Sequence, residues 1–371
     1  MKIAIVAAGF TPSEADKLRQ AIGSKRSRER MEQLKERFFA GMRDNGIDDE
    51  LGEQIWLKLA AFANYGFPES HSVSFSYLVY ASSWIKHHYP AAFCAALLNA
   101  QPMGFWSPHT LVGDARRHGV VVRTPDLNAS AASAILEGDS EAEVRLGLEY
   151  VRGIGTDLAE EISAGRPYAS VEDLRRRMPK LSLPILEALA TSGAFGCFGI
   201  DRRSALWTAG AMAQTSEDRL AGIVTGIDAP TLPGMSPEEL SHADLWATGV
   251  APDGHPTRYI REKLTGIGVI TATGLIDQPA GERVFVGGVV THRQRPATAG
   301  GTTFLNLEDE TGLINVVISK GCWQRYKGVA RGAPALLIRG RLEKEEGVIN
   351  VVADKLEPLP VGKAPASSDF R

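Results

Sequence analysis

One stretch decides the predicted fold: Tyr65-Gly66-Phe67-Pro68-Glu69-Ser70-His71-Ser72, with an aromatic and apolar segment from Val73 to His87 directly behind it. The glycine turn, the Ser/His pair and the Tyr89-Pro90 stop predict a helix from Ser70 to His88. The first N–H groups of such a helix can face an anion. A lone histidine at a helix start is more often a cap or a packing residue, so an anion contact by Ser70 and His71 is one of two interpretations.

The same helix carries Tyr77, Tyr80 and Trp84 at helical spacing. Such spacing marks one face of a helix, and aromatic residues on one face are more often core than a surface for stacking bases. We therefore expect these three side chains to be buried.

Size and composition bound the class of protein. The chain has 371 residues, of which 44% are hydrophobic and 23% charged. At roughly 100–200 residues per domain, this suggests a folded protein of several domains.

No apolar run reaches the roughly 18 residues of a membrane span, and the apolar start is too short for a good signal peptide. Three distant cysteines argue against a disulfide framework or a paired-cysteine zinc site. We expect a cytoplasmic protein with no membrane contact and no metal ligands.

Charge is distributed unevenly along the chain. The net charge of −3 alone argues against nucleic-acid binding. Between Lys17 and Arg43, however, nine basic residues face three acidic ones, and between Arg283 and Leu356 eleven face seven. Local basic surfaces on an acidic whole are typical of a multidomain nucleic-acid machine.

Glycines mark a second motif. Gly153-Ile154-Gly155 lies between apolar helical segments and resembles a helix-hairpin-helix. Its glycines let the backbone turn sharply, and the N–H groups that open the next helix can face a phosphate. We predict duplex-phosphate contacts from Arg152, Gly153, Gly155 and Thr156. The alternative is an ordinary glycine-linked helix pair. Residues 186–203 look like a second copy with looser glycine spacing, and the alternative for this copy is that it serves only for packing against the first.

A period of two begins at Arg283. Five alternating segments, with a short helical piece from Trp323 to Val329 between the third and fourth, predict an OB-fold barrel. Phe304 can stack on a base if it faces outward. The candidate single-strand contacts are Arg293, Arg295, Phe304, Lys320, Arg339 and Arg341. The alternatives are a protein-docking barrel and charges that are merely solvated.

The predicted fold class is therefore multidomain α+β. The expected segments are a helical region at 1–128, tandem helix-hairpin-helices at 129–214, a linker with helices at 215–282, the OB barrel at 283–358 and a disordered tail at 359–371. We find no P-loop, no zinc-protease motif and no tight pair of aspartates for two magnesium ions. No catalytic residue is predicted.

Taken in order, these blocks resemble the C-terminal half of a DnaE-type DNA polymerase, the bacterial DNA polymerase III alpha subunit family, over nearly the whole chain. The matching blocks are Leu18-Arg19-Gln20-Ala21-Ile22-Gly23 with Lys25-Arg26, residues 62–67, residues 85–93 and Pro125-Asp126-Leu127-Asn128. The resemblance makes residues 1–128 a partial fingers domain. It also implies that Arg19, Lys25, Arg26, Ser70 and His71 meet the incoming nucleotide or the template.

Departures from the family pattern narrow the resemblance. Pro68-Glu69 stands where replicative subunits carry Asn-Lys, which is similar to the error-prone, ImuC-like branch. Gln20 replaces a second arginine. No clamp-binding peptide is found between Gln214 and Arg283, so contact with the sliding clamp is expected to be indirect, through accessory mutagenesis proteins.

The resemblance implies a DNA-directed DNA polymerase as the parent chain, with magnesium held by an upstream palm. This chain would begin inside the fingers, have no cofactor of its own and be inactive alone. Its expected function is the DNA- and partner-binding part of damage-induced translesion synthesis, on single-stranded template and primer–template duplex. The alternative is a scaffold that recruits accessory mutagenesis factors and has little affinity for DNA.

Overall fold

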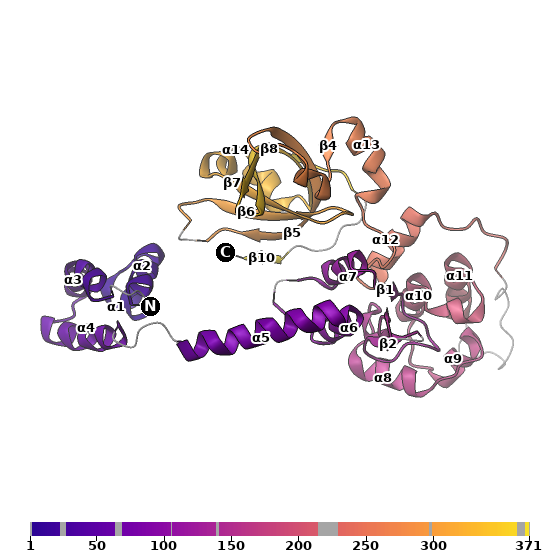
Figure 1. Ribbon diagram of the computed structural model, residues 1–371. Helices are drawn as coiled ribbons and strands as arrows, with labels where there is room; N and C mark the ends of the chain where they lie inside the picture. Colours follow the sequence, from indigo (N-terminus) through magenta and orange to yellow (C-terminus); the bar gives the residue numbers. More distant parts are fainter. Residues whose placement is uncertain are drawn as a thin grey trace. The chain divides into compact units, whose positions relative to one another are not determined.

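The computed structural model describes residues 2–22, 27–63, 69–104, 106–138, 141–213, 229–296, 299–361 and 368–370. The chain divides into two compact units, one formed mainly by residues 1–83 and the other by residues 84–294 and 303–370. Figure 1 shows the elements of both units.

The first unit is helical. It contains α1 (Lys2–Ala8), α2 (Pro12–Ile22), α3 (Ser27–Asp44), α4 (Asp49–Ala63) and most of α5 (Glu69–His88). Phe38 is fully buried, and its ring centroid lies 5.8 Å from that of Phe10 and 5.2 Å from that of Trp56. Thr11 and Glu14 form a reciprocal cap at the start of α2, with each side chain accepting the other's N–H. The helix predicted from Ser70 to His88 is confirmed as α5.

The aromatic face of α5 is exposed, which contradicts the prediction of a core. Tyr77, Tyr80 and Trp84 are 73%, 72% and 46% exposed. Helical spacing does place side chains on one face, but burial also requires a second element against that face. The spacing therefore identified the face correctly and its burial wrongly.

The second unit begins with two helices and a small sheet. These are α6 (Pro90–Asn99), α7 (Pro108–Arg117), β1 (Val121–Arg123), β2 (Ile135–Glu137) and β3 (Glu143–Arg145). The strand order is β1-β3-β2, with β1 parallel and β2 antiparallel to β3. Cys94, Leu98, Val112 and Val144 form the core between helices and sheet. The small, polar residues around Ile135–Glu137 are typical of a loop, and a strand of only three residues leaves no alternation that would reveal it.

The helix-hairpin-helix region follows. Its elements are η1 (Leu148–Tyr150), α8 (Thr156–Ala164), α9 (Val171–Arg177), α10 (Leu183–Ser192), η2 (Ala194–Phe198) and α11 (Arg202–Ala213). Leu148, Ile162, Leu174, Leu186 and Phe195 are fully buried in one core. The repeated turns thus pack into a single domain.

Residues 229–282 are not a simple linker. They form α12 (Pro237–Ala247), η3 (Arg258–Ile260), α13 (Arg261–Gly266), β4 (Val269–Ile270) and η4 (Thr273–Ile276). Arg202 of α11 contacts Asp244 of α12 at 2.7 Å, with both side chains largely buried. Val250 lies in the core of α6 and α7. The polar, Pro-rich composition concealed this packing, because α12 buries few but well-placed groups. The predicted linker residues 215–228 lie outside the described part of the chain.

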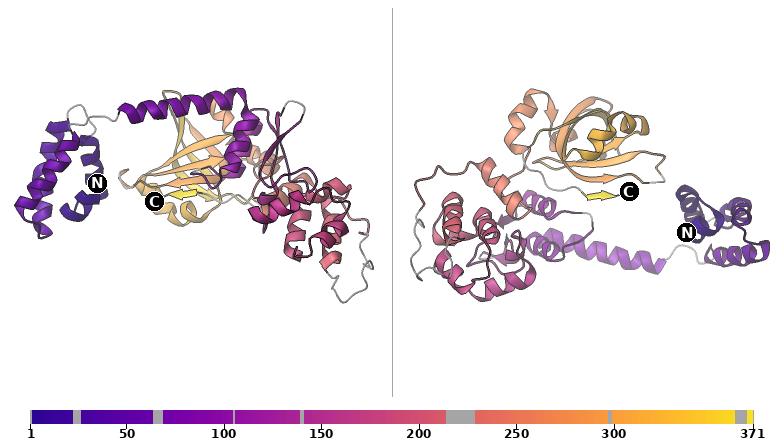
Figure 2. Two further views of the ribbon diagram at one scale, coloured as in Figure 1. Left: turned by 90° about the horizontal axis from the view of Figure 1, so that it is seen from below. Right: turned by 180° about the vertical axis from the view of Figure 1, so that it is seen from behind.

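The C-terminal domain is the predicted five-stranded barrel. Its strands are β5 (Arg283–Gln294), β6 (Thr303–Glu308), β7 (Leu313–Ile318), β8 (Ala335–Glu345) and β9 (Val348–Pro358), with α14 (Lys320–Gly332) between β7 and β8. The pairing runs β5-β6-β7-β9-β8 and closes through β8 on β5. β5 is long enough to pair with β8 at one end and β6 at the other. The barrel appears from two further sides in Figure 2.

Two predicted boundaries differ from the structure. The helices and strand of residues 90–128 belong to the second unit, not to a domain with residues 1–83. Within the predicted disordered tail, residues Ser368–Phe370 form β10, which pairs with β5 at His292–Gln294. A long strand leaves an edge that offers hydrogen bonds to an added strand, and local composition does not reveal it.

Candidate nucleic-acid interface

The first hairpin turn presents open backbone. Gly153 has a φ of +84°, the left-handed region that favours glycine. Gly155 is the N-cap of α8, and a Cβ built there meets no atom within 4 Å. The N–H groups that follow open the helix and have no carbonyl one turn earlier to bind. The turn thus combines free donors, the positive end of a helix dipole and room for a phosphate.

Arg152 lies beside this turn. Its guanidinium carbon is 5.0 Å from the centre of the Trp246 ring, a cation–π contact. The backbone N–H of Arg152 donates to the carbonyl of Ala247 at 2.7 Å. α12 therefore holds Arg152 in place next to the α8 start. Thr156, the first residue of α8, is exposed there. The four residues predicted for duplex phosphates occur together in the structure.

The second hairpin differs at the corresponding position. The carboxylate of Asp201 accepts the N–H groups of Arg203 (2.9 Å) and Ser204 (3.1 Å) and the hydroxyl of Ser204 (2.6 Å). These hydrogen bonds lower the pKa of Asp201, and the one from the Ser204 hydroxyl has the largest effect. The start of α11 thus already has its own anion, so the interpretation of this copy as a packing element stays a prediction.

An exposed strip crosses β6 and β7 of the barrel. Phe304 is 38% exposed and Leu313 37%. Between them, the Asn306 amide donates to the side-chain oxygen of Asn315 at 2.8 Å. Phe304 is paired across the sheet with half-buried Val317. We call Phe304, Asn306, Leu313, Asn315 and Val317 the barrel platform. The outward orientation on which base stacking by Phe304 depends is therefore present.

Arg293 does not belong to the exposed surface. It is only 7% exposed, its Nε–H donates to the carbonyl of Ala330 at 2.9 Å, and its Nη2 contacts the carbonyl of Ala333. A buried cation at the last carbonyls of α14 stabilises that helix end. A β-bulge between Val290 and His292 changes the alternation of β5, which is why the period of two misplaced Arg293. Its predicted contact with single-stranded DNA is wrong.

The other basic candidates of the barrel lie on its surface. Arg339 is paired with Asp354 at 2.7 Å, and Arg341 with Glu343 at 2.5 Å. Lys320 and Arg295 are exposed. Ion pairs between exposed residues are weak and exchange readily for phosphate contacts. These four therefore stay predicted single-strand contacts.

The candidates in the first unit are less defined. Arg19 is 63% exposed in its side chain and is paired with Asp16 at 2.9 Å. His71 is exposed, with its ring 4.5 Å from that of Phe75. Lys25, Arg26 and the side chain of Ser70 lie outside the described residues. Within the described part, no contact joins Arg19 to His71.

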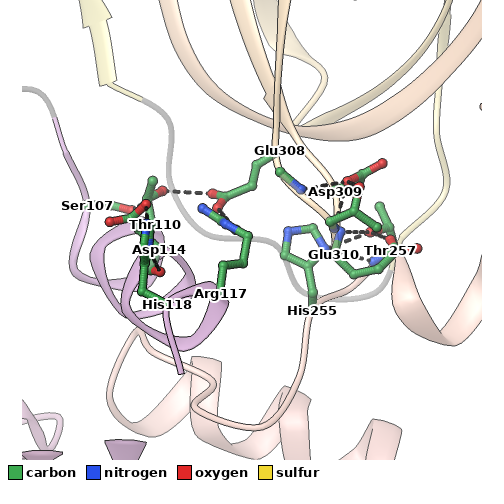
Figure 3. Close-up of polar contacts among 12 residues, drawn as sticks. Ser107, Thr110, Asp114, Arg117, His118, His255, Thr257, Glu308, Asp309 and Glu310 are labelled. Atoms are coloured by element: carbon green, nitrogen blue, oxygen red, sulfur yellow. Dashed lines mark hydrogen bonds and ion pairs between the residues drawn. The ribbon is translucent and has the colours of Figure 1, made fainter. Parts of the chain in front are cut away.

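A buried acidic cluster joins α7 to the barrel, and sequence reasoning missed it. Glu308, at the end of β6, is only 2% exposed. Its carboxylate accepts the hydroxyl of Thr110 at 2.9 Å and is 3.2 Å from Nη1 of Arg117 (Figure 3). Burial raises the pKa of Glu308, and Arg117 opposes that rise. The only sequence signal is the run Glu308-Asp309-Glu310 directly after an apolar strand.

The rest of the acidic run contacts residues 255–261. Thr257 donates its hydroxyl to Glu310 at 2.5 Å, and Arg261 contacts Glu310 and, at 3.3 Å, Asp309. Behind these pairs, the rings of His109 and His255 stack with centroids 5.8 Å apart. Burial lowers the pKa of His109 to about 4 and that of His255 to about 3. We call this set of contacts between α7, residues 251–261 and the barrel the junction.

The junction should weaken in mild acid. His109 stays neutral when folded, but its ordinary pKa of 6.5 returns on unfolding, so the unfolded chain binds more protons below that pH. Stability is therefore lost as the pH falls from 6.5 towards about 4. Between pH 7 and pH 5.5, we expect His109 to lower the free energy of unfolding by about 1 kcal/mol. Urea unfolding of the unaltered chain and of His109→Gln at both pH values measures this. A stability difference between the two that is independent of pH would contradict it.

The described residues contain no group of three or more His, Cys, Asp or Glu side chains suited to a metal ion. None of the described helices is long and apolar enough to cross a membrane.

Comparison with known proteins agrees with this architecture. Residues 1–46 match the family model of the bacterial DNA polymerase III alpha subunit finger domain, residues 119–205 that of a helix-hairpin-helix motif and residues 284–359 that of an OB-fold nucleic acid binding domain. A finger domain of this kind, followed by a helix-hairpin-helix and an OB fold, is the order that the resemblance to DNA polymerase III alpha subunits predicts.

Within that class, the similarity is to error-prone DNA polymerases. The whole chain is 54% identical to part of the one from Mycolicibacterium paratuberculosis, 55% to that of Nocardia farcinica and 52% to that of Corynebacterium efficiens. It covers 34%, 33% and 34% of these relatives, so it spans about a third of their length. Over its whole length the chain is thus a homologue of the C-terminal part of error-prone DNA polymerases, and the resemblance to the error-prone branch is confirmed.

Proposed function

We propose that the chain is the DNA-binding portion of an error-prone DNA-directed DNA polymerase that copies damaged templates. The observation that carries the proposal is the barrel platform, with an exposed aromatic ring on β6 and β7. The β6 and β7 face is the one through which OB barrels bind oligonucleotides. An exposed aromatic ring can stack on a base of any sequence, which suits the copying of irregular templates.

The hairpin turn supplies the second half of the proposal. Backbone N–H groups at the start of α8 bind phosphates without regard to sequence, so they hold a primer–template duplex in any register. Chemistry on the nucleotide requires carboxylates that bind magnesium, and we propose that these lie elsewhere in the parent chain. This chain alone is then inactive. Accessory mutagenesis proteins and, through them, the sliding clamp are its proposed protein partners.

Replacing the exposed ring tests the platform. Phe304→Ala should weaken binding of single-stranded DNA about tenfold, since stacking on one aromatic ring contributes about 1–3 kcal/mol per base. Fluorescence anisotropy with a labelled oligonucleotide at low and moderate salt measures the affinity. Ile267→Ala truncates an even more exposed apolar side chain outside the barrel and should change nothing.

Salt dependence separates the two candidate functions. If the chain binds nucleic acid, affinity should fall steeply with added salt, because bound cations are released from the phosphates. Weak binding that ignores both salt and Phe304→Ala would favour the scaffold alternative. Pull-down with accessory factors would then be the next measurement.

A further inference from the structure

An apolar cavity lies at one end of the barrel platform, between α6, α7 and the first residue of β7. Its volume is about 440 Å³. The larger apolar side chains of its lining are Phe93, Leu97, Met103, Trp106, Leu111 and Leu313. This volume is within the range that binds small organic groups, roughly 300–1,000 Å³. Neither the hairpin turn nor the stacking of a base on Phe304 uses this cavity.

Trp106 stands at its edge. The indole is 39% exposed, and its ring packs edge-on against His292 of β5, with centroids 4.8 Å apart. This contact holds the indole while leaving part of it exposed. The cavity therefore offers an aromatic surface as well as aliphatic walls.

The cavity is continuous with the platform through Leu313. Leu313, Asn315 and Val317 face the same side of β7, because side chains alternate along a strand. Val317 is paired with Phe304, and Leu313 lines the cavity. The four residue steps from Leu313 to Val317 span roughly 13 Å. A single strand stacked on Phe304 that follows β7 would therefore reach the cavity within a few nucleotides.

Charged groups at the rim suit a nucleotide. Nζ of Lys86 is 2.6 Å from the carboxylate of Asp114, and Arg117 lies on the same wall. The cations are suited to a phosphate, and the carboxylate accepts hydrogen bonds from an exocyclic amino group. A nucleobase has apolar faces and a polar edge, which matches the walls and the rim together. An aliphatic side chain of a partner protein would use only the walls.

From these features we propose that the cavity receives one unstacked base of the single strand that the barrel platform binds. This inference rests on the proposed function, since it requires the strand to follow β7. A base held there would be removed from its neighbours and fixed in position. The cavity would thus set the path of the template beyond the stacking contact at Phe304.

A scan with abasic sites tests the proposal. The ligand is a mixed-sequence primer–template with a short single-stranded overhang, whose duplex end fixes the register. Each overhang position in turn is made abasic, and affinity for the chain is measured by anisotropy. Loss of the base that stacks on Phe304 should weaken binding at one overhang position. At a second position, the one whose base enters the cavity, loss of the base should weaken binding about tenfold as well. The cavity-filling variant Leu111→Trp should abolish the effect at that position alone.

Two controls assign the outcomes. Ile267→Trp adds the same ring at an exposed site outside the cavity and should leave the profile unchanged. In Phe304→Ala, overall affinity should fall while the effect at the cavity position remains.

A flat scan, or an identical profile in Leu111→Trp, would overturn the inference and leave the proposed function standing. Absence of all DNA binding by the unaltered chain would overturn both. Loss of partner-protein binding in Leu111→Trp, with DNA binding intact, would assign the cavity to a protein side chain.

Discussion

Arg117→Ala should destabilise the second unit by about 3 kcal/mol. Glu308 is 2% exposed, and its carboxylate relies on Arg117 at 3.2 Å for a compensating charge. Removing one partner of a buried ion pair leaves the other charge in a medium that solvates it poorly, which costs about 3–5 kcal/mol. We expect the lower end, because Arg117 is itself 26% exposed and water partly replaces it. Urea unfolding at neutral pH, followed by tryptophan fluorescence, measures the loss.

Rescue by a second substitution separates charge from shape. Glu308→Gln in the Arg117→Ala background removes the unpaired charge and keeps an oxygen for the Thr110 hydroxyl, so most of the stability should return. The deficit of Arg117→Ala should also shrink at low pH, where the carboxyl of Glu308 takes up a proton.

The matched control is Arg341→Ala, which breaks an ion pair whose side chains are 62% and 45% exposed. Such a pair contributes about 0.2–1 kcal/mol or nothing measurable. Equal losses in Arg117→Ala and Arg341→Ala would show that burial of Glu308 is irrelevant.

The junction also shows where sequence analysis stops. Thr110 and Glu308 are 198 residues apart, and neither belongs to a pattern that points to the other. The strands of the barrel were predictable because alternation is local and repeats over five segments. A contact between a helix and a distant loop has no period, so it becomes visible only when the chain is folded.

The same distinction separates the turn at Gly153 and Gly155, whose geometry was predictable, from Arg293, whose direction was not. Gly153 and Gly155 were recognisable because an αL turn before a helix requires glycine at a fixed place. Arg293 was misplaced because one bulge in β5 reverses which side chains face inward. Local chemistry therefore predicts turns and caps well. The direction of a charged side chain on a strand depends on register, which local chemistry does not determine.

Gly155→Asp should weaken binding of duplex DNA about a hundredfold. Gly155 has φ −88° and ψ 173°, a conformation that any residue adopts, and a Cβ there meets nothing within 4 Å. Aspartate is a preferred N-cap residue, so the helix should be as stable as before or slightly more so. Its carboxylate would, however, occupy the N–H groups of α8 and place a negative charge where the phosphate is expected. Each charge-assisted hydrogen bond lost costs about 1.5–3 kcal/mol, so loss of one or two corresponds to about a hundredfold.

Gly196→Asp is the matched control, because it adds the same charge in the second hairpin at a position where a Cβ also meets nothing within 4 Å. Since Asp201 already caps α11, this variant should bind duplex nearly as well as the unaltered chain. Titration of a blunt duplex at several salt concentrations also gives the slope of affinity against salt, which should decrease by about one for Gly155→Asp alone. Equal effects of the two variants would mean that the chain responds only to its total charge. Unaltered binding by Gly155→Asp would assign the duplex contact to another surface.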